Sequence, residues 1–362
     1  MGAHASGGVA AEKDEDEQRV PCKSICGRTP IRAAGSRASL APRTIHGPRP
    51  YTSLNSTCGR DQQRRRRRIM LATSVTGTDH RSHDSADRAA AAAPPPLYTI
   101  GSSDSERDRL RSQTDELHEH SVALLQRVGI QQGWKVLEIA CGPRGVLELL
   151  AEHVGPTGAV TGLDINPVHV AQARRHATAL GLGNVTVLEA DARRSTLPAG
   201  SFDLVYARLI LVNVPDPERV VSEMVRLVKP GGWLACEEAD CGAMLCQPPH
   251  PAYSRLTDTL LALYRHDGAD ILIGRRLHQL LDVAGVIDIG VEARADVPPP
   301  GHPRRTVILD ILQAMRTKIT EQGLLNTTEL DALDRDARTH LADSGTMIMP
   351  HLSFMAWGRK PF

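Results

Sequence analysis

Between about residues 98 and 240, short apolar runs alternate with segments whose apolar residues recur at helical spacing. Each apolar run ends in a Gly, Pro or Asn turn, and the helical pattern begins after it, as at Asn166-Pro167 and Pro217. Strands and helices that alternate in this way are joined by right-handed crossovers, so they predict a parallel sheet with helices on both faces. The predicted strands are 135–140, 159–163, 185–189, 202–206 and 233–237.

The pattern before and after this region is mainly helical. Residues 103–106 have the form of a capping box, and leucines from Leu110 to Leu125 follow at helical spacing, which predicts one long helix ahead of the first strand. Beyond Ala239 we expect further helices and two strands that complete the sheet, with the helices covering the substrate. The expected helices are 250–266, 271–284, 305–322 and 328–343, and the strands lie near 287–293 and 347–357.

The first 96 residues show no periodic apolar pattern. They consist mainly of Gly, Ala, Ser, Pro and Arg, with an acidic patch near the start. A segment of this composition buries too little apolar surface to offset its ordering entropy, so we expect a disordered leader over 1–96 and a folded domain over 97–362. The run Arg64–Arg68 is interpreted as a solvated part of that leader, with a nuclear signal or RNA-binding arm as the alternative. Met70, which follows it, is an alternative start of the protein.

Charge and cysteine content narrow the class of protein further. The formal net charge is only +1, which excludes a strong overall attraction for nucleic acid or anionic membranes. No apolar stretch is long enough to span a bilayer, and the start lacks the pattern of a secretory signal, so we expect a cytoplasmic protein. Seven cysteines without a disulfide framework fit a reducing compartment. The spacing of Cys236, Cys241, Cys246 and His250 matches no zinc motif, and no metal site is predicted.

Acidic residues stand at the ends of the first three predicted strands. Glu138 precedes the small-residue turn 140–145, Asp164 ends the second strand, and Asp191 follows the third. Ligands of parallel sheets bind beyond these strand ends, where Asp164 can accept the hydroxyls of an adenosine ribose. Nicotinamide-binding domains share the first two features. Only the third, an acid suited to the exocyclic amine of adenine, favours a different adenosine cofactor.

Five segments carry a more specific resemblance: VLEIACGPRG, VTGLDINP, VLEADA, FDLVYARLILVNVPDP and LVKPGGWLACEE. In this order and spacing they resemble the class I S-adenosylmethionine-dependent methyltransferases, in particular the small-molecule branch similar to the enzymes of ubiquinone and menaquinone biosynthesis and to natural-product methyltransferases. The resemblance implies an α/β Rossmann-like fold, with a mostly parallel seven-stranded sheet, helices on both faces and a helical substrate cover from about 240 to 345. It also implies methyl transfer to an oxygen, nitrogen or carbon atom of a small molecule.

The resemblance also assigns the cofactor, S-adenosyl-L-methionine, to particular residues. Glu138 and the backbone of 140–142 would face the methionine amino group, Asp164 the ribose and Asp191 the adenine, while Arg208 would close the site. The family usually has glycine where Ala140 and Arg144 stand, and Arg144 comes near the methionine unless it turns outward. The predicted cofactor-binding residues are Tyr98, Gln113, Glu138, Ala140, Cys141, Gly142, Asp164, Ile165, Asp191, Ala192 and Arg208.

Two other functions remain open at this point. Methyltransferases that modify exocyclic amines of nucleic acids carry an Asn/Asp-Pro-Pro-aromatic turn after the fourth strand, where this chain has residues 207–210, Ala-Arg-Leu-Ile. An RNA-modifying enzyme is therefore an alternative, as is a non-catalytic protein that binds the cofactor. His250, His266 and His351 are the available general bases, and the sequence singles out none of them. It predicts neither the acceptor nor the oligomeric state.

Overall fold

The computed structural model describes Ile100 and residues 104–362, and the side chains of these residues except those of Asp104 and Ser105. The predicted leader and the predicted cofactor residue Tyr98 lie outside the described residues. Ser103, the first residue of the predicted capping box, also lies outside them.

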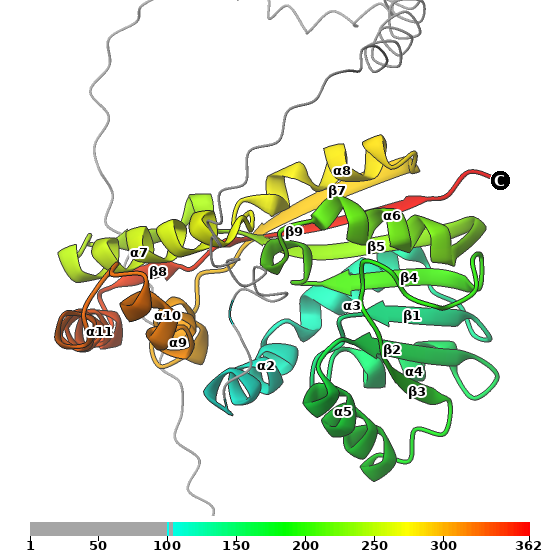
Figure 1. Cartoon of the computed structure of the whole chain (residues 1–362), viewed down its shortest axis with the longest axis horizontal. Helices are drawn as coiled ribbons and strands as arrows, with labels where there is room; N and C mark the ends of the chain where they lie inside the picture. Colours follow the sequence, from blue (N-terminus) through cyan, green and yellow to red (C-terminus); the bar gives the residue numbers. More distant parts are fainter. Residues whose placement is uncertain (1–99, 101–103) are drawn as a thin grey trace, which may run out of the picture. The chain divides into compact units, whose positions relative to one another are not determined.

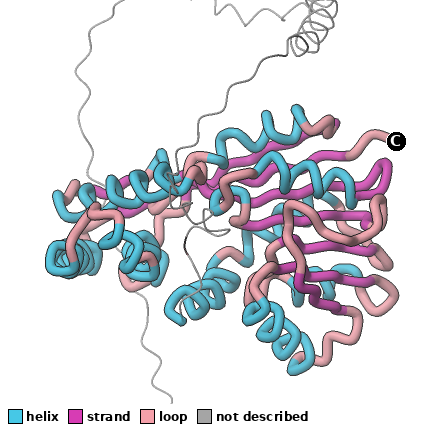
Figure 2. The backbone as a smooth tube through the Cα atoms, in the orientation of Figure 1, coloured by secondary structure: helices cyan, strands magenta, loops and turns pink. Residues whose placement is uncertain are grey.

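A seven-stranded sheet forms the centre of the described region (Figures 1 and 2). The strands β1 to β5 are parallel to one another. The strand β9 pairs antiparallel with β5 on one side and with β7 on the other. The order is β3-β2-β1-β4-β5-β9-β7, and the predicted Rossmann-like fold is confirmed. The strands are β1 (Lys135–Ile139), β2 (Ala159–Asp164), β3 (Val185–Glu189), β4 (Phe202–Arg208), β5 (Val228–Asp240), β7 (Ile287–Ala295) and β9 (Leu352–Arg359).

Helices cover both faces of the sheet, as the sequence predicts. Alternate side chains of one strand enter separate cores because successive residues of a strand point to opposite faces. On β1, Val136 packs in one core and Leu137 in the other. The core around Val136 is closed by α3 (His118–Val128), α4 (Leu147–Val154) and α5 (Pro167–Ala179), whereas α6 (Pro217–Leu227) and α8 (Leu277–Val283) close the core around Leu137.

A mainly helical cover stands beyond the carboxyl ends of the parallel strands (Figure 1). Within it α7 packs on α11 and α9, and α9 also contacts α2. A short ribbon of β6 and β8 belongs to the same part of the chain. The cover comprises α2 (Asp104–Glu116), β6 (Leu245–Gln247), α7 (Pro251–Asp267), the 3-10 turn η4 (Pro303–Thr306), α9 (Val307–Ala314), α10 (Arg316–Glu321), α11 (Thr327–Ala342) and β8 (Met347–Met349).

Several predicted elements are divided in the structure. The helix expected before the first strand is wrong as a single element, because α2 and α3 are separated at the buried Leu117. The helix expected over 305–322 is α9 and α10, separated at Met315, and the one over 271–284 begins as a 3-10 turn, η3 (Ile273–Arg276). The strand expected over 347–357 is also divided into two strands, β8 and β9, of which only β9 joins the large sheet. Pro350, which has no N–H to donate, lies between them.

None of the helices between residues 104 and 362 is both long and apolar enough to cross a membrane.

Candidate functional site

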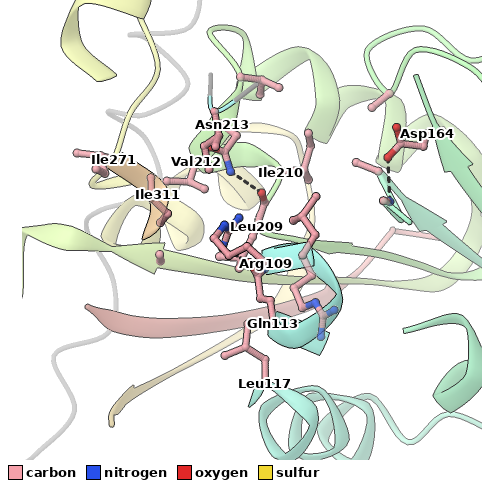
Figure 3. A pocket seen from close by; sticks show the side chains of 18 of the residues that line it. Arg109, Gln113, Leu117, Asp164, Leu209, Ile210, Val212, Asn213, Ile271 and Ile311 are labelled. Carbon is pink, nitrogen blue, oxygen red and sulfur yellow. Dashed lines mark hydrogen bonds between the residues drawn. The ribbon is translucent and has the colours of Figure 1, made fainter. Parts of the chain in front are cut away.

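A cavity of about 280 Å³ opens at the carboxyl ends of β1, β2, β3 and β4, where α2, α7 and α9 come down over the sheet (Figure 3). This is the edge at which parallel α/β sheets bind ligands. Eight of the predicted cofactor residues line it: Gln113, Ala140, Gly142, Asp164, Ile165, Asp191, Ala192 and Arg208. The side chains of Glu138 and Cys141 are buried behind the turn and are not among the lining residues.

The turn after β1 is shaped by residues with positive φ. Ala140 has φ +54° and Gly142 φ +62°, which lets the backbone reverse within a few residues. The Cys141 amide donates to Leu163 O (2.9 Å), and the Cys141 side chain lies beside Gly162 of β2. These contacts attach the turn to β2, and Ala140 and Gly142 of the turn line the cavity.

The buried side chain of Glu138 stabilises the end of this turn. Both of its carboxylate oxygens accept from the Val146 amide at 3.0 Å, just before α4 begins. Burial raises the pKa of Glu138 to about 8, although the positive charge of Arg208 opposes the shift. A methyl group at Gly145 would collide with the carboxylate, so only glycine fits there. The predicted contact of Glu138 with a methionine amino group stays a prediction.

Asp164, at the tip of β2, is positioned by two backbone amides. Its Oδ2 accepts from Gly142 N and its Oδ1 from Asn166 N, both at 2.8 Å. Figure 3 shows the Asp164 side chain in the lining of the cavity. Asn166 in turn caps α5 by accepting from Val168 N at 2.9 Å. Each carboxylate oxygen can accept a second hydrogen bond. The carboxylate can therefore bind a diol in the cavity while it holds the β1 turn and the start of α5.

His169, which the sequence analysis did not select, also lines the cavity. The residue is 4% exposed, and its Nδ1 lies 3.5 Å from Asp164 Oδ1. The Nε2 atom is buried and has no hydrogen-bond partner among the described residues. The position three residues after the Asn166 cap was the available signal, because that turn of α5 faces the tip of β2.

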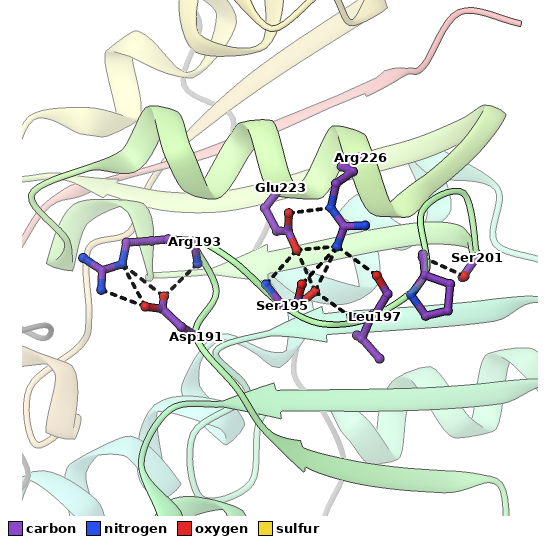
Figure 4. A network of polar contacts seen from close by, with 8 residues as sticks. Asp191, Arg193, Ser195, Leu197, Ser201, Glu223 and Arg226 are labelled. Carbon is purple, nitrogen blue, oxygen red and sulfur yellow. Dashed lines mark hydrogen bonds and ion pairs between the residues drawn. The ribbon is translucent and has the colours of Figure 1, made fainter.

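Asp191, after β3, is paired with Arg193 (Figure 4). Its oxygens accept from Arg193 N at 2.9 Å and from the guanidinium at distances down to 2.7 Å. The hydrogen bonds from the Arg193 side chain hold the pKa of Asp191 below its usual range. The predicted contact of this carboxylate with an adenine amine stays a prediction. Asp191 lines the same cavity as Asp164, and each of its oxygens already accepts two hydrogen bonds from Arg193, so a ligand amine would have to displace or share one of these donors.

Arg208 connects the sheet to the N-terminal helices. Its guanidinium donates to Thr114 Oγ1 (3.0 Å) and Ser121 Oγ (3.3 Å), on α2 and α3. The Ser121 hydroxyl is itself bound to Glu237 and to Tyr206, both fully buried. This network fixes the angle at which α2 passes over the cavity.

Arg144 turns away from the cavity. Its guanidinium pairs with Asp115 of α2 at 2.7 Å and lies 3.6 Å from Glu148 of α4. It is not among the residues that line the cavity, so it leaves room where the family usually has glycine.

The part of the cavity under the cover is mainly apolar. Its polar members include Arg109, Glu116, Arg304 and His351, whereas His250 and His266 are not among the lining residues. Burial lowers the pKa of His351 to about 3, so the ring is neutral at pH 7. The apolar lining comprises Val212, Val214, Val220, Leu260, Tyr264, Ile271, Val307, Ile308 and Ile311.

Two further buried groups border this part. The carboxylate of Glu238 accepts from the amides of residues 210–212 at 2.8–3.1 Å and thereby holds the 3-10 turn η1 (Leu211–Asn213). Cys241, at the end of β5, lines the cavity, and burial raises the pKa of its thiol to about 12. The Cys241 thiol is therefore protonated at neutral pH and is a poor nucleophile.

Comparison with known proteins finds similar sequences and similar structures. Residues 136–232, which run from β1 into β5, match the family model described as a methyltransferase domain. These residues, which form β1 to β4 and the start of β5, are thus similar to a methyltransferase domain.

Curated relatives narrow the resemblance. The chain is 38% identical over 115 residues to a demethylmenaquinone methyltransferase of Geobacillus kaustophilus, covering 32% of this chain and 49% of the relative. It is 40% identical over 107 residues to the protein of the same name from Listeria monocytogenes, covering 30% of this chain and 45% of that one. The chain thus spans about half the length of the curated relatives it matches.

Solved structures with similar folds include phosphoethanolamine N-methyltransferase 2 of Haemonchus contortus in complex with S-adenosyl-L-methionine (TM-score 0.45, 21% identity, 67% of this chain and 53% of that one). The [4+2]-cyclase SpnF is also similar (TM-score 0.44, 20% identity, 67% of this chain and 80% of that one).

Proposed function

We propose that this protein transfers the methyl group of S-adenosyl-L-methionine to a small-molecule acceptor. The proposal rests on one continuous cavity. Asp164 and Asp191 line it at the ends of neighbouring strands, and its apolar part lies under the helical cover. The match of residues 136–232 to a methyltransferase domain supports it. The cover lies over the acceptor side, which favours a small molecule over a polymer.

In this proposal the protein binds and orients. S-adenosyl-L-methionine, when bound, supplies a methyl group that its sulfonium has already activated. Asp164 binds the ribose hydroxyls and Asp191 the adenine amine, while the turn at 140–142 sets how closely the cofactor approaches the sheet. The apolar chamber excludes water and holds the acceptor in line, an effect worth up to about 7–11 kcal/mol in favourable cases.

Of the three histidines that the sequence offered as general bases, only His351 lines the described cavity, and it is not suited to strong base catalysis. His351 lines the chamber, but its Nε2 atom accepts from Arg304 at 3.2 Å, because a guanidinium can only donate. The low pKa of this ring makes it a weak base. The proposal therefore favours an acceptor that is already nucleophilic at neutral pH.

The assay that tests the proposed function measures release of S-adenosylhomocysteine by the whole chain. Reactions contain the small-molecule fraction of a cell extract, total RNA, or neither. We expect release with the small-molecule fraction alone, and an increase in the dissociation constant of S-adenosylhomocysteine of about tenfold or more for Asp164→Ala, since each hydrogen bond to a charged group contributes about 1.5–3 kcal/mol.

Glu152→Ala is the matched control. Glu152 is an exposed acid on α4 outside the cavity, and its loss should leave release and affinity unchanged. Release with RNA alone would favour the RNA-modifying alternative. Cofactor binding without release under any condition would favour the non-catalytic alternative, and tight binding of NAD in place of S-adenosylhomocysteine would overturn both the cofactor and the function.

A further inference from the structure

The 3-10 turn η4 contains two consecutive buried arginines with very different surroundings. Arg305 is 4% exposed and donates to four backbone carbonyl oxygens, of Pro298, Leu341, Asp343 and Thr346, at 2.7–3.2 Å. A guanidinium with this many carbonyl partners fixes the chain around it. Arg305 is therefore a structural residue of the cover.

Arg304 is equally buried, but fewer of its N–H donors have a hydrogen-bond partner. It is 5% exposed, its Nη2 donates to His351 Nε2 at 3.2 Å, and its Nε is buried without a hydrogen-bond partner among the described residues. Burial lowers the pKa of this guanidinium from its ordinary value. A buried charge with an unmatched donor costs free energy, which a ligand of opposite charge recovers when it binds.

The nearest carboxylate does not complete the pair. Asp296 Oδ2 lies 3.8 Å from Arg304 Nη2, beyond hydrogen-bond distance. The same carboxylate is also only 3.1 Å from His120 Nε2 and is about one-third exposed, with 34% of its side-chain surface open to solvent. Asp296 therefore screens Arg304 without satisfying its donors.

Arg304 lines the same cavity as the proposed cofactor residues, next to an apolar wall of α9 that includes Val307, Ile308 and Ile311. Glu116, half-buried in the lining, opposes a second negative charge. Two of the four arginines in the described lining are paired with a carboxylate, Arg109 with Glu106 and Arg193 with Asp191. Arg208 and Arg304 then stand with Glu116 and Asp164 in the same lining.

Resting on the proposed methyltransferase function, we propose that the methyl acceptor is a small apolar carboxylic acid and that Arg304 binds its carboxylate. The apolar wall binds the body of the acceptor, and the free Nε donor together with an Nη donor forms the planar fork that matches a carboxylate. The cofactor itself carries a carboxylate on its methionine part, so the test must distinguish these two sources of the anion.

The test is isothermal titration of the full chain saturated with S-adenosylhomocysteine. The probes are benzoate, cinnamate and octanoate, each compared with its primary amide, which has a similar shape and no charge. We expect at least one acid to bind about tenfold or more tightly than its amide. Equal affinity of acids and amides in all three pairs would overturn the proposal.

Variants at Arg304 assign the effect to this residue. Arg304→Gln should abolish the preference for acid over amide and leave the dissociation constant of S-adenosylhomocysteine unchanged. Arg304→Lys keeps the charge without the fork and should retain only part of the preference. Asp296→Asn removes the screening carboxylate and should tighten binding of the acid, a gain that a loss of folding cannot produce.

Two outcomes separate this proposal from others. If Arg304→Gln and Arg304→Lys both weaken S-adenosylhomocysteine strongly, Arg304 holds the methionine carboxylate of the cofactor and the acceptor proposal is wrong. If the wild-type chain does not bind S-adenosylhomocysteine at all, the proposed function fails. The acid and amide pairs, titrated without it, still test whether Arg304 binds an anion, and equal affinities there would overturn the anion site as well.

Discussion

At Ala140 a residue with a β-carbon adopts a backbone conformation that favours glycine. Its φ of +54° lies in the left-handed region, which costs an L-residue about 1–2 kcal/mol. Glycine avoids this cost but loses about 0.5–1 kcal/mol more conformational entropy on folding. We therefore expect Ala140→Gly to raise the free energy of unfolding by about 0.5–1 kcal/mol, measured by urea denaturation. Ala332→Gly, inside helix α11, is the control and should lower it by about 1 kcal/mol.

The Asp191–Arg193 pair makes a second prediction at this scale. If an adenine amine donates to Asp191, then Asp191→Ala should weaken S-adenosylmethionine and S-adenosylhomocysteine alike, by about tenfold, and Asp191→Asn by less because it keeps an acceptor oxygen. Arg193→Gln removes the internal partner and should not weaken either ligand. Calorimetry with both ligands measures this. A loss confined to Arg193→Gln would mean that the guanidinium, and not the carboxylate, contacts the cofactor.

The sequence predicted the residues whose position follows from chain topology. Asp164 and Asp191 end adjacent parallel strands, so their meeting in one cavity follows from the strand pattern alone. Arg304 and His169 were missed because their role depends on which donors and acceptors remain unmatched after packing. The arginines at 304 and 305 are neighbours in sequence, and only the three-dimensional contacts distinguish them.

At the scale of elements, Glu223 attaches α6 to the loop that follows β3 (Figure 4). Its carboxylate accepts from Ser195 N (2.8 Å), Ser195 Oγ (2.6 Å) and the guanidinium of Arg226 (2.7 Å), and it is 7% exposed. Hydrogen bonds to a charged group of this kind contribute about 1.5–3 kcal/mol. Glu223→Gln should therefore lower the free energy of unfolding at pH 7 by about 1–3 kcal/mol, while Glu218→Gln, at an exposed position of the same helix, should change it by less than about 0.5 kcal/mol.

The pH dependence of this effect has a definite sign. Hydrogen bonds from Arg226 and Ser195 lower the pKa of Glu223 to about 2 in the folded protein, from an ordinary value of 4.5. A carboxylate with a depressed pKa contributes stability that is complete above its unfolded-state pKa and is lost as the pH falls through the folded value. The difference between wild type and Glu223→Gln should therefore be constant above about pH 5 and shrink towards pH 2. A difference that grows on acidification would contradict this assignment.

The predicted element boundaries fail where tertiary packing, rather than local sequence, ends an element. No glycine or proline marks the break at Leu117 or at Met315, where a buried apolar side chain stands between two helices. The start of β5 at Val228 was missed because Pro230 and two glycines suggested a turn, and the pairing with β4 indeed shifts register there. The three-residue strand β6 is too short to show an alternating pattern.

At the scale of the whole molecule, the sequence predicts that residues 1–69 are dispensable. The two buried cores of the described region are built from Ile100 and residues beyond it. A chain that starts at Met70 should have the same melting temperature and the same dissociation constant for S-adenosylhomocysteine as the full chain, measured by calorimetry. A melting temperature several degrees lower would mean that the leader packs on the domain.

The position of β9 has a consequence for how the protein is made. β9 lies between β5 and β7 and is the last of the described strands in the sequence. The sheet can therefore be completed only after β9 has left the ribosome. Until residues 352–359 emerge, the side of β5 that will bind β9 is an unpaired edge with Leu234 and Cys236 on it, and β7 has no partner in the sheet. Such an edge pairs readily with other chains. A chain that ends before Leu352 should therefore aggregate more readily than the full chain.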